Sequence, residues 1–368
     1  MELLFLAHRA PTAPDRGDRI RSFHVLKHLA ARADVHVVAF DEGPAPRPDL
    51  PLASWTVVPR TKSRARAVAE ALATGRPVSL TAFAALGMTA ALARLPRVDA
   101  TYVFSGQMAQ HVADGFVMDF VDVDSAKFAQ LAASARGPRK WLLAREARLL
   151  ATYERATAAR ASASLFVSEA EAAVFGQGLA IGNGIDADHF RPGAVPPAVA
   201  PGRLIVFTGQ MDYQPNVDAV LWFARAVLPK LDATLAIVGR APTAAVRALA
   251  GPRVIVTGEV ADTRPWLAAA SVCVAPLFLA RGVQNKVLEA MAMARPVVAT
   301  PAAAEGIDHR GTIRVAEPAF IAEAVTALID EPGTLGEQAR ARVLAGYGWD
   351  ARLARLDHVL GLDQQLAA

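Results

Sequence analysis

Short apolar runs alternate with amphipathic segments along almost the whole chain, and this alternation constrains the fold more than any other feature. It is plainest in the second half, where the runs 203–207, 235–238 and 271–275 each precede a segment with helical periodicity. Near-continuous apolar strands separated by amphipathic helices are typical of parallel sheets covered on both faces. The pattern therefore predicts an α/β fold.

The expected elements follow this alternation from one end of the chain to the other. Strands are expected at 2–7, 34–40, 55–58, 100–104, 116–121, 163–167, 203–207, 235–238, 253–257, 271–275 and 296–299. Helices are expected at 17–32, 64–74, 80–94, 138–160, 216–231, 262–270 and 285–294, with one more beginning at Pro242.

A proline-rich stretch divides the alternating pattern into two halves. The chain has 368 residues, which suits two α/β domains better than one, and residues 185–202 contain four prolines without periodicity. We predict two Rossmann-like domains that face each other across a cleft. The expected parts are an N-terminal domain (1–184), a linker (185–202), a C-terminal domain (203–345), and a C-terminal helix that packs back on the N-terminal domain (346–368).

Composition excludes several other classes of protein. Cys273 is the single cysteine, so no disulfide can form within the chain and no cysteine metal site is expected. The first strand-like run has no basic leader, and no apolar window approaches the length that spans a bilayer. We therefore expect a cytoplasmic protein.

Positive charge is concentrated in two N-terminal segments. The first holds Arg60, Lys62, Arg64 and Arg66, and the second, residues 136–160, has seven basic and two acidic residues around Trp141. These segments form either a solvated surface or a patch that contacts anionic lipid at the inner face of a membrane. A nucleic-acid partner is not expected, because no recognised binding motif or set of stacking aromatics accompanies the charge.

Loops after strands are the expected place for a ligand in open parallel sheets. In the loop 208–216, Gly209 allows a ligand to approach the backbone and Asn216 can cap the following helix. The alternative is a simple turn between a strand and a helix.

A second loop runs into a helix and carries positive charge. Arg281 and Gly282 precede a helix that begins near Gln284 or Asn285, and Lys286 opposes the dipole at its start. A bound diphosphate would resolve this conflict, since amides at a helix N-terminus favour anions. Glu289 lies one turn after Asn285 and can accept hydrogen bonds from two ribose hydroxyls. The alternative is an ordinary surface helix.

Two short motifs point elsewhere but are weak. Residues 182–187 match the alanine-ended dinucleotide fingerprint, but the following residues do not read as a helix. Asp122-Val123-Asp124 resembles the paired aspartates that hold a divalent metal in an enzyme class with a different fold. We expect neither a nicotinamide site nor a metal site. His24 and His28 lack the flanking glutamate of a zinc protease, and no nucleophile elbow or Walker loop is present.

Several segments together resemble a known family. Lys286-Val287-Leu288-Glu289-Ala290-Met291-Ala292 resembles the donor-site helix of family 4 glycosyltransferases with the GT-B fold, and Asn183-Gly184-Ile185-Asp186 with Phe190-Arg191-Pro192 resembles the entry to their second domain. A narrower resemblance is to the sugar transferases of exosortase (PEP-CTERM) exopolysaccharide systems. It is carried by residues 8–24, 119–127, 208–217 and 283–286.

This resemblance implies a retaining, metal-independent transfer of a sugar from a nucleotide sugar, UDP- or GDP-linked, to a glycan, lipid-linked or small-molecule acceptor. No separate cofactor is implied. The second domain would hold the donor and the first the acceptor. The implied donor-binding residues are Gly17, Gly209, Gln210, Gly258, Val260, Gly282, Gln284, Asn285, Lys286 and Glu289. The expected catalytic residues are Arg281, Lys286, Asp122 and Asp124.

One departure leaves alternatives open. Arg281 stands where family 4 enzymes often have a glutamate, and Gln210 and Asn216 replace the usual Arg and Lys. In this chain, Arg281 and Lys286 would then supply the positive charge that the usual Arg and Lys supply in family 4 enzymes. The alternative functions are a nucleotide-sugar epimerase of the same fold and an inactive nucleotide-sugar-binding protein.

Overall fold

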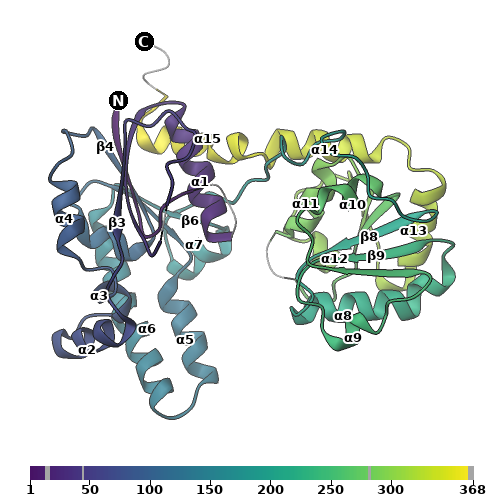
Figure 1. Cartoon of the computed structure of the whole chain (residues 1–368), viewed down its shortest axis with the longest axis horizontal. Helices are drawn as coiled ribbons and strands as arrows, with labels where there is room; N and C mark the ends of the chain where they lie inside the picture. The colour runs from purple at the N-terminus through teal and green to yellow at the C-terminus, as the bar shows by residue number, and fades with distance from the viewer. Residues whose placement is uncertain (13–16, 44, 281–282, 364–368) are drawn as a thin grey trace. The chain divides into compact units, whose positions relative to one another are not determined.

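The computed structural model describes residues 1–12, 17–43, 45–280 and 283–363. The chain divides into two compact units (Figure 1). Unit 1 consists of Met1–Asn183 together with the C-terminal residues from Arg352, and unit 2 consists of Gly184–Ala351. Each unit is built on one parallel sheet with helices between the strands. The predicted α/β alternation is confirmed.

Unit 1 contains a seven-stranded sheet within the described residues, in the order β3-β2-β1-β4-β5-β6-β7. Its strands are β1 (Glu2–Ala7), β2 (Asp34–Asp41), β3 (Ser54–Pro59), β4 (Ala100–Phe104), β5 (Val117–Val121), β6 (Ala163–Phe166) and β7 (Leu179–Ala180). Its helices before unit 2 are α1 (Gly17–Ala30), α2 (Arg64–Thr74), α3 (Val78–Thr81), α4 (Leu86–Leu92), η1 (Gly106–His111), α5 (Asp124–Ser134), α6 (Gly137–Arg160) and α7 (Glu169–Phe175).

Unit 2 contains a six-stranded sheet within its described part, in the order β10-β9-β8-β11-β12-β13. Its strands are β8 (Leu204–Thr208), β9 (Thr234–Val238), β10 (Val254–Gly258), β11 (Val272–Ala275), β12 (Val297–Ala299) and β13 (Arg314–Val315). Its helices are α8 (Gln214–Trp222), η2 (Phe223–Val227), η3 (Leu228–Lys230), α9 (Ala244–Arg247), α10 (Arg264–Ala269), α11 (Asn285–Ala292), α12 (Pro301–Ala304), η4 (Pro318–Phe320), α13 (Ile321–Asp330) and α14 (Leu335–Gly346).

Both sheets share the doubly wound strand order, in which the first strand of the unit lies inside the sheet and later strands are added on both sides of it. In unit 2, β8 pairs on one side with β9 and on the other with β11, so the direction of winding reverses between β8 and β11. Strands β8, β9 and β11 are buried at every residue, which explains their uninterrupted apolar sequences. The carboxyl ends of these strands frame a crevice where ligands bind in such folds.

Two expected helices differ from the structure. The helix expected at 216–231 begins earlier, at Gln214, and α8 ends at Trp222, where a π-turn and a 3-10 turn follow. Pro229 lies in this irregular stretch, and proline cannot donate the backbone hydrogen bond that would continue an α-helix. The helix expected at 80–94 is split into α3 and α4, because Ala85 between them is extended.

The last helix, α15 (Trp349–Leu360), crosses the division between the units. Its residues from Arg352 belong to unit 1, where the Asp357 carboxylate lies 2.7 Å from His28 Nε2 and 3.2 Å from Arg32 Nε. Leu353 and Leu356 are fully buried on the same helix. At its start, Trp349 packs so closely on Gly184 that a Cβ there would lie 2.6 Å from the Trp349 Cα.

Candidate functional site

A cavity of about 420 Å³ opens in unit 2 at the carboxyl ends of β8, β9 and β10, beside the start of α11. It therefore lies next to the point where the winding of the sheet reverses, the usual ligand position in this class of fold. The cavity is lined by Thr208, Gly209, Gln210, Val238, Gly239, Arg240, Glu259, Val260, Thr263, Val283, Asn285, Lys286 and Glu289.

Two glycines bring the loops after β8 and β9 together at the floor of this cavity. A Cβ on Gly239 would lie 1.8 Å from the backbone oxygen of Gly209, so no other residue fits there without a shift of the backbone. A Cβ on Gly209 would lie 2.8 Å from Asn216 Nδ2. The glycines thus leave backbone surface exposed to a ligand, as close approach requires.

Lys286, at the start of α11, contacts one residue of β8 and one residue of the following helix, α8. Its Nζ donates a hydrogen bond of 2.6 Å to Asn216 Oδ1 and lies 4.7 Å from the centre of the Phe207 ring. Asn216 Nδ2 in turn donates to the backbone oxygen of Gln210 at 2.9 Å. The sequence suggested that Asn216 caps the helix, but the structure places it inside α8. It is a buried residue there and orients the Lys286 side chain.

Burial alters the protonation of two neighbouring groups. It lowers the pKa of Lys286 to about 8, against the opposing effect of the Glu289 carboxylate. It raises the pKa of Glu289 to about 7, and the Lys286 ammonium opposes this shift. Among the residues that the structure describes, the Glu289 carboxylate accepts no hydrogen bond, although it lines the cavity. Strongly shifted groups of this kind are concentrated at functional sites.

Arg240 was not predicted and adds a cation to the same cavity. Its Nη2 donates to Gln210 Oε1 at 2.9 Å, while Gln210 Nε2 donates to Asp212 Oδ1 at 2.6 Å. Gly239 and Arg240 follow directly after β9. Ligands in parallel sheets bind beyond the carboxyl ends of strands, so this rule could have predicted Arg240 from the sequence. The other lining residues that lie outside the predicted loops are Val238, Gly239 and Thr263.

The predicted donor-side residues fall into three groups. Gly209, Gln210, Val260, Asn285, Lys286 and Glu289 all line the cavity. Gly258, at the end of β10, and Gln284, just before α11, are close in sequence to lining residues but are not among them. Arg281 and Gly282 lie outside the described residues.

The remaining predicted residues belong to unit 1: Gly17 was predicted for the donor, and Asp122 and Asp124 for the acceptor side. Gly17 is the first residue of α1, Asp122 is exposed, and Asp124 is partly buried at the start of α5. Burial raises the pKa of Asp124, and Lys127 opposes that shift. The backbone amides here already have acceptors, since Val123 N donates to Glu171 Oε2 at 2.7 Å and Ser125 N to Glu154 Oε1 at 3.0 Å.

Asp119, three residues earlier, has a different environment. This fully buried carboxylate accepts hydrogen bonds from Arg21 Nε at 2.9 Å and from the Tyr102 hydroxyl at 2.5 Å. Arg21 Nη1 also donates to Ile181 O at 2.7 Å and to Asn183 Oδ1 at 3.1 Å. These hydrogen bonds join α1, β4 and β5 to the segment that precedes unit 2, so the role of Asp119 and Arg21 is structural.

The weaker motifs behave as ordinary structure. After residues 182–187, the described chain forms a turn in which Asp186 Oδ1 accepts from the amides of Asp188 and His189, and no helix follows at once. His24 and His28 are both buried. Within the described ranges, no three His, Cys, Asp or Glu side chains are grouped as a metal site.

Comparisons with known proteins agree with this geometry. Residues 202–331, which contain the cavity, match the family described as glycosyl transferases group 1. No curated protein sequence matches the chain.

Solved structures resemble the whole chain at low sequence identity. They include a glycosyltransferase from Rickettsia africae ESF-5 (14% identity, TM-score 0.63, 98% of each chain covered) and WaaG, a glycosyltransferase involved in lipopolysaccharide biosynthesis (18%, 0.62, 98% of this chain and 100% of WaaG). A third is Anabaena Alr3699/HepE in complex with UDP (15%, 0.61, 98% and 100%). These likenesses confirm the predicted two-domain α/β fold, and the segment that matches the glycosyl transferases group 1 family lies within unit 2.

Proposed function

We propose that the protein is a glycosyltransferase that takes its sugar from a nucleoside diphosphate sugar bound in the cavity of unit 2. The observation that carries the proposal is the pairing of a cationic helix start with an unsatisfied carboxylate, Lys286 and Glu289, in one cavity. The cavity lies inside the segment that matches the glycosyltransferase family, and a solved relative of the same fold is in complex with UDP.

The cavity offers a separate partner for each part of such a donor. The Glu289 carboxylate accepts hydrogen bonds from the two ribose hydroxyls, which supply the donors that it lacks in the described protein. Lys286, Arg240 and the first amides of α11 meet the diphosphate, because helix N-termini and cations favour phosphate. Val260 and its neighbours after β10 border the base.

The transfer requires a nucleoside diphosphate to leave with its negative charge. Preorganised cations and amides that face this charge lower the barrier, because they need no rearrangement during the reaction. We propose a retaining, metal-independent reaction in which the protein mainly positions two substrates, and in which Arg281 adds to the positive charge. Gly17, Gly258, Gly282 and Gln284 keep their proposed donor-side roles.

The acceptor is proposed to meet unit 1, with Asp122 and Asp124 as the catalytic carboxylates there. The sequence resemblance to family 4 enzymes of exosortase systems favours a glycan or lipid-linked acceptor in exopolysaccharide synthesis. Replacing Asp122 with asparagine removes charge with little change in shape. Unchanged turnover in this variant would exclude the residue from the reaction.

The first test is thermal stabilisation of the purified protein by UDP, GDP, dTDP and NAD. A ligand at about 100 times its Kd adds roughly 2.7 kcal/mol to the free energy of unfolding. We expect a shift with one nucleoside diphosphate and its loss in Glu289→Ala. A shift with NAD alone, or an equal shift in the variant, would reject the proposed donor site.

A second arm separates the transferase from its alternatives. The nucleotide sugar that stabilises the protein is incubated with and without a cell-envelope extract, and its products are resolved. Transfer that needs the extract supports the proposal. Conversion of the nucleotide sugar to an epimer without an acceptor would identify an epimerase, and no turnover in either case would identify a binding protein.

A further inference from the structure

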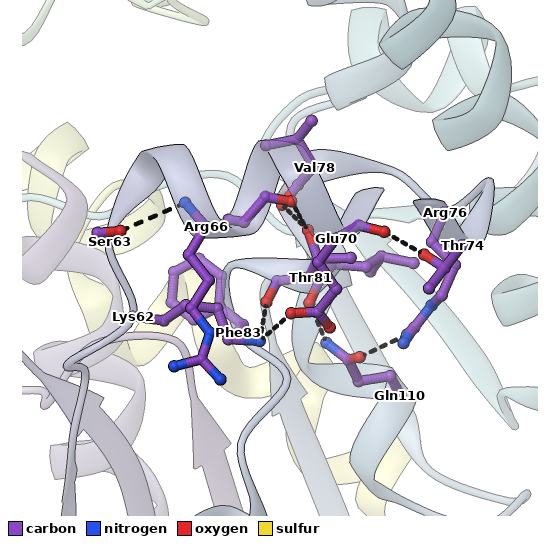
Figure 2. Close-up of polar contacts among 12 residues, drawn as sticks. Lys62, Ser63, Arg66, Glu70, Thr74, Arg76, Val78, Thr81, Phe83 and Gln110 are labelled. Atoms are coloured by element: carbon purple, nitrogen blue, oxygen red, sulfur yellow. Dashed lines mark hydrogen bonds and ion pairs between the residues drawn. The ribbon is translucent and has the colours of Figure 1, made fainter. Parts of the chain in front are cut away.

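In the first basic segment of unit 1, the two cations Arg60 and Lys62 are engaged by other groups of the protein. Lys62 Nζ lies 2.8 Å from Glu70 Oε2 and donates to the Thr81 backbone oxygen at 2.8 Å, as Figure 2 shows. Arg60 pairs with Glu42, and its guanidinium lies 5.2 Å from the centre of the Phe83 ring. Lys62 therefore links α2 to α3, and Arg60 is held by Glu42 and Phe83, so both cations already have partners within unit 1.

The second segment begins with cations that have no such partners. Arg136, Arg139 and Lys140 are exposed at the beginning of α6, and no hydrogen bond or ion pair engages their side chains among the described residues. Farther along α6, Arg145 donates to the backbone oxygens of Ala71 and Arg76. Cations at a helix N-terminus oppose the helix dipole, so the three free charges do not serve to stabilise α6.

Exposed apolar side chains accompany these cations. Trp141 is 60% exposed and Leu131, near the end of α5, is 43% exposed. Helices α5 and α6 pack against each other and extend away from the sheet of unit 1, with their connecting loop at the far end (Figure 1). We call Leu131, Arg136, Arg139, Lys140 and Trp141 the hairpin tip.

We propose that the hairpin tip docks on the surface of a bilayer that contains anionic phospholipids. Lys and Arg side chains meet anionic headgroups, and tryptophan favours the boundary between headgroups and acyl chains. In the described part of the chain no helix is long and apolar enough to cross a membrane, so the contact is one with the surface. The inference goes beyond the nucleotide site and does not depend on it.

The combination of side chains favours a bilayer over other anionic partners. A nucleic acid would be met by cations that follow its backbone, with aromatic side chains placed for stacking on successive bases. Here a tryptophan and a leucine lie among three cations at the end of one hairpin, which suits shallow insertion of apolar groups between charged headgroups.

The test is co-sedimentation of the full chain with two kinds of vesicle. One kind contains phosphatidylcholine alone, and the other contains phosphatidylcholine mixed with phosphatidylglycerol. We expect binding to the anionic vesicles only, and its loss at high salt. The variant Arg136→Gln, Arg139→Gln, Lys140→Gln is expected to bind about a hundredfold more weakly, since each cation contributes about fivefold.

A matched control variant removes the same number of positive charges from unit 2. Arg225, Lys230 and Arg314 are exposed in unit 2, and the triple change to glutamine should leave vesicle binding unchanged. The tip also has a spectroscopic signature: wild-type tryptophan emission should move to shorter wavelength on anionic vesicles, and Trp141→Phe should remove most of that change.

Several outcomes would overturn the proposal. One is failure of the wild-type protein to bind anionic vesicles, and another is an equal loss in the unit 2 control. Release from the vesicles by soluble glycerol phosphate would indicate a site for free phosphate instead. Tighter binding to duplex DNA at the same salt, lost in the tip variant, would indicate a nucleic-acid surface. Thermal stabilisation by a nucleoside diphosphate, measured on the same samples, tests the donor site separately.

Discussion

The two units bury charged groups in similar sheets but for opposite purposes. In unit 1, the Asp119 carboxylate has Arg21 and Tyr102 as partners, so its charge joins separate segments of the fold. In unit 2, the partly buried Glu289 has no hydrogen-bond donor within the described residues, and Lys286 has one acceptor, Asn216. The comparison teaches that burial of charge does not by itself mark a site. A binding site is indicated where a charged side chain lines a cavity and lacks hydrogen-bond partners within the protein.

The largest expected effect tests the structural half of this comparison. Asp119→Ala leaves Arg21 buried without its counter-ion, so we expect it to lower the free energy of unfolding by about 3–5 kcal/mol. Chemical denaturation measures the change. The exposed Asp122→Ala serves as the control and should change stability by less than about 0.5 kcal/mol. Similar values for the two variants would contradict the assigned role of Asp119.

Lys286 should behave in the opposite way. If the proposed donor site is correct, Lys286→Ala removes a preorganised cation that faces the departing diphosphate, so we expect the rate of transfer to fall by about 10²–10³. Its stability should change little, because the variant no longer buries an ammonium. Steady-state kinetics and thermal unfolding on the same preparation measure both quantities, with the exposed Lys230→Ala as the control. A loss of rate below about threefold would remove Lys286 from the mechanism.

Arg240 extends the comparison of the two units to a cation of the cavity that the sequence did not predict. A charge-assisted hydrogen bond contributes about 1.5–3 kcal/mol, so Arg240→Gln should weaken nucleoside diphosphate binding roughly tenfold or more. The monophosphate should lose less affinity and the nucleoside none. Calorimetric titration of the three ligands measures this gradient. Arg247→Gln, which removes the same charge outside the cavity lining, should leave all three affinities unchanged. An equal loss for all ligands would indicate a distorted loop.

The smallest effect is a dependence of nucleotide affinity on pH. Glu289 must be ionised to accept two hydroxyls, and its pKa is raised to about 7, so affinity should rise as pH increases through 7. Lys286 must be protonated to meet phosphate, and its pKa is lowered to about 8, so affinity should fall above pH 8. Titrations across this range should show a maximum between the two values. Glu289→Gln should lose the acidic limb only, and a flat wild-type profile would contradict the pairing.

The sequence predicted correctly those strands that are determined by a local run of apolar residues. Strands such as β1 and β9 are uninterrupted apolar runs, and their bounds differ from the prediction by at most one residue. The end of α8 was missed because helical periodicity continues through Phe223–Val227 while the backbone forms a π-turn. The short strands β7 and β13 are two residues long, too short for any periodic pattern.

The same distinction applies to the site. Lys286 and Glu289 were predicted because they lie on one helix, where spacing fixes their relation. The hydrogen bond between Lys286 and Asn216 joins residues 70 positions apart and depends on the adjacency of β8 and β11. No local pattern contains that adjacency, so Asn216 was assigned to the helix end that it could cap by itself.

The division of α15 between the units has a consequence for biosynthesis. A ribosome makes residues 184–351 before it makes the part of α15 that carries Asp357, Leu353 and Leu356. Unit 2 can therefore complete its fold while unit 1, although its sheet is made first, still lacks the last helix. During this interval the surface of α1 that holds His28 stays uncovered, so nascent unit 1 is the part that a chaperone would have to shield.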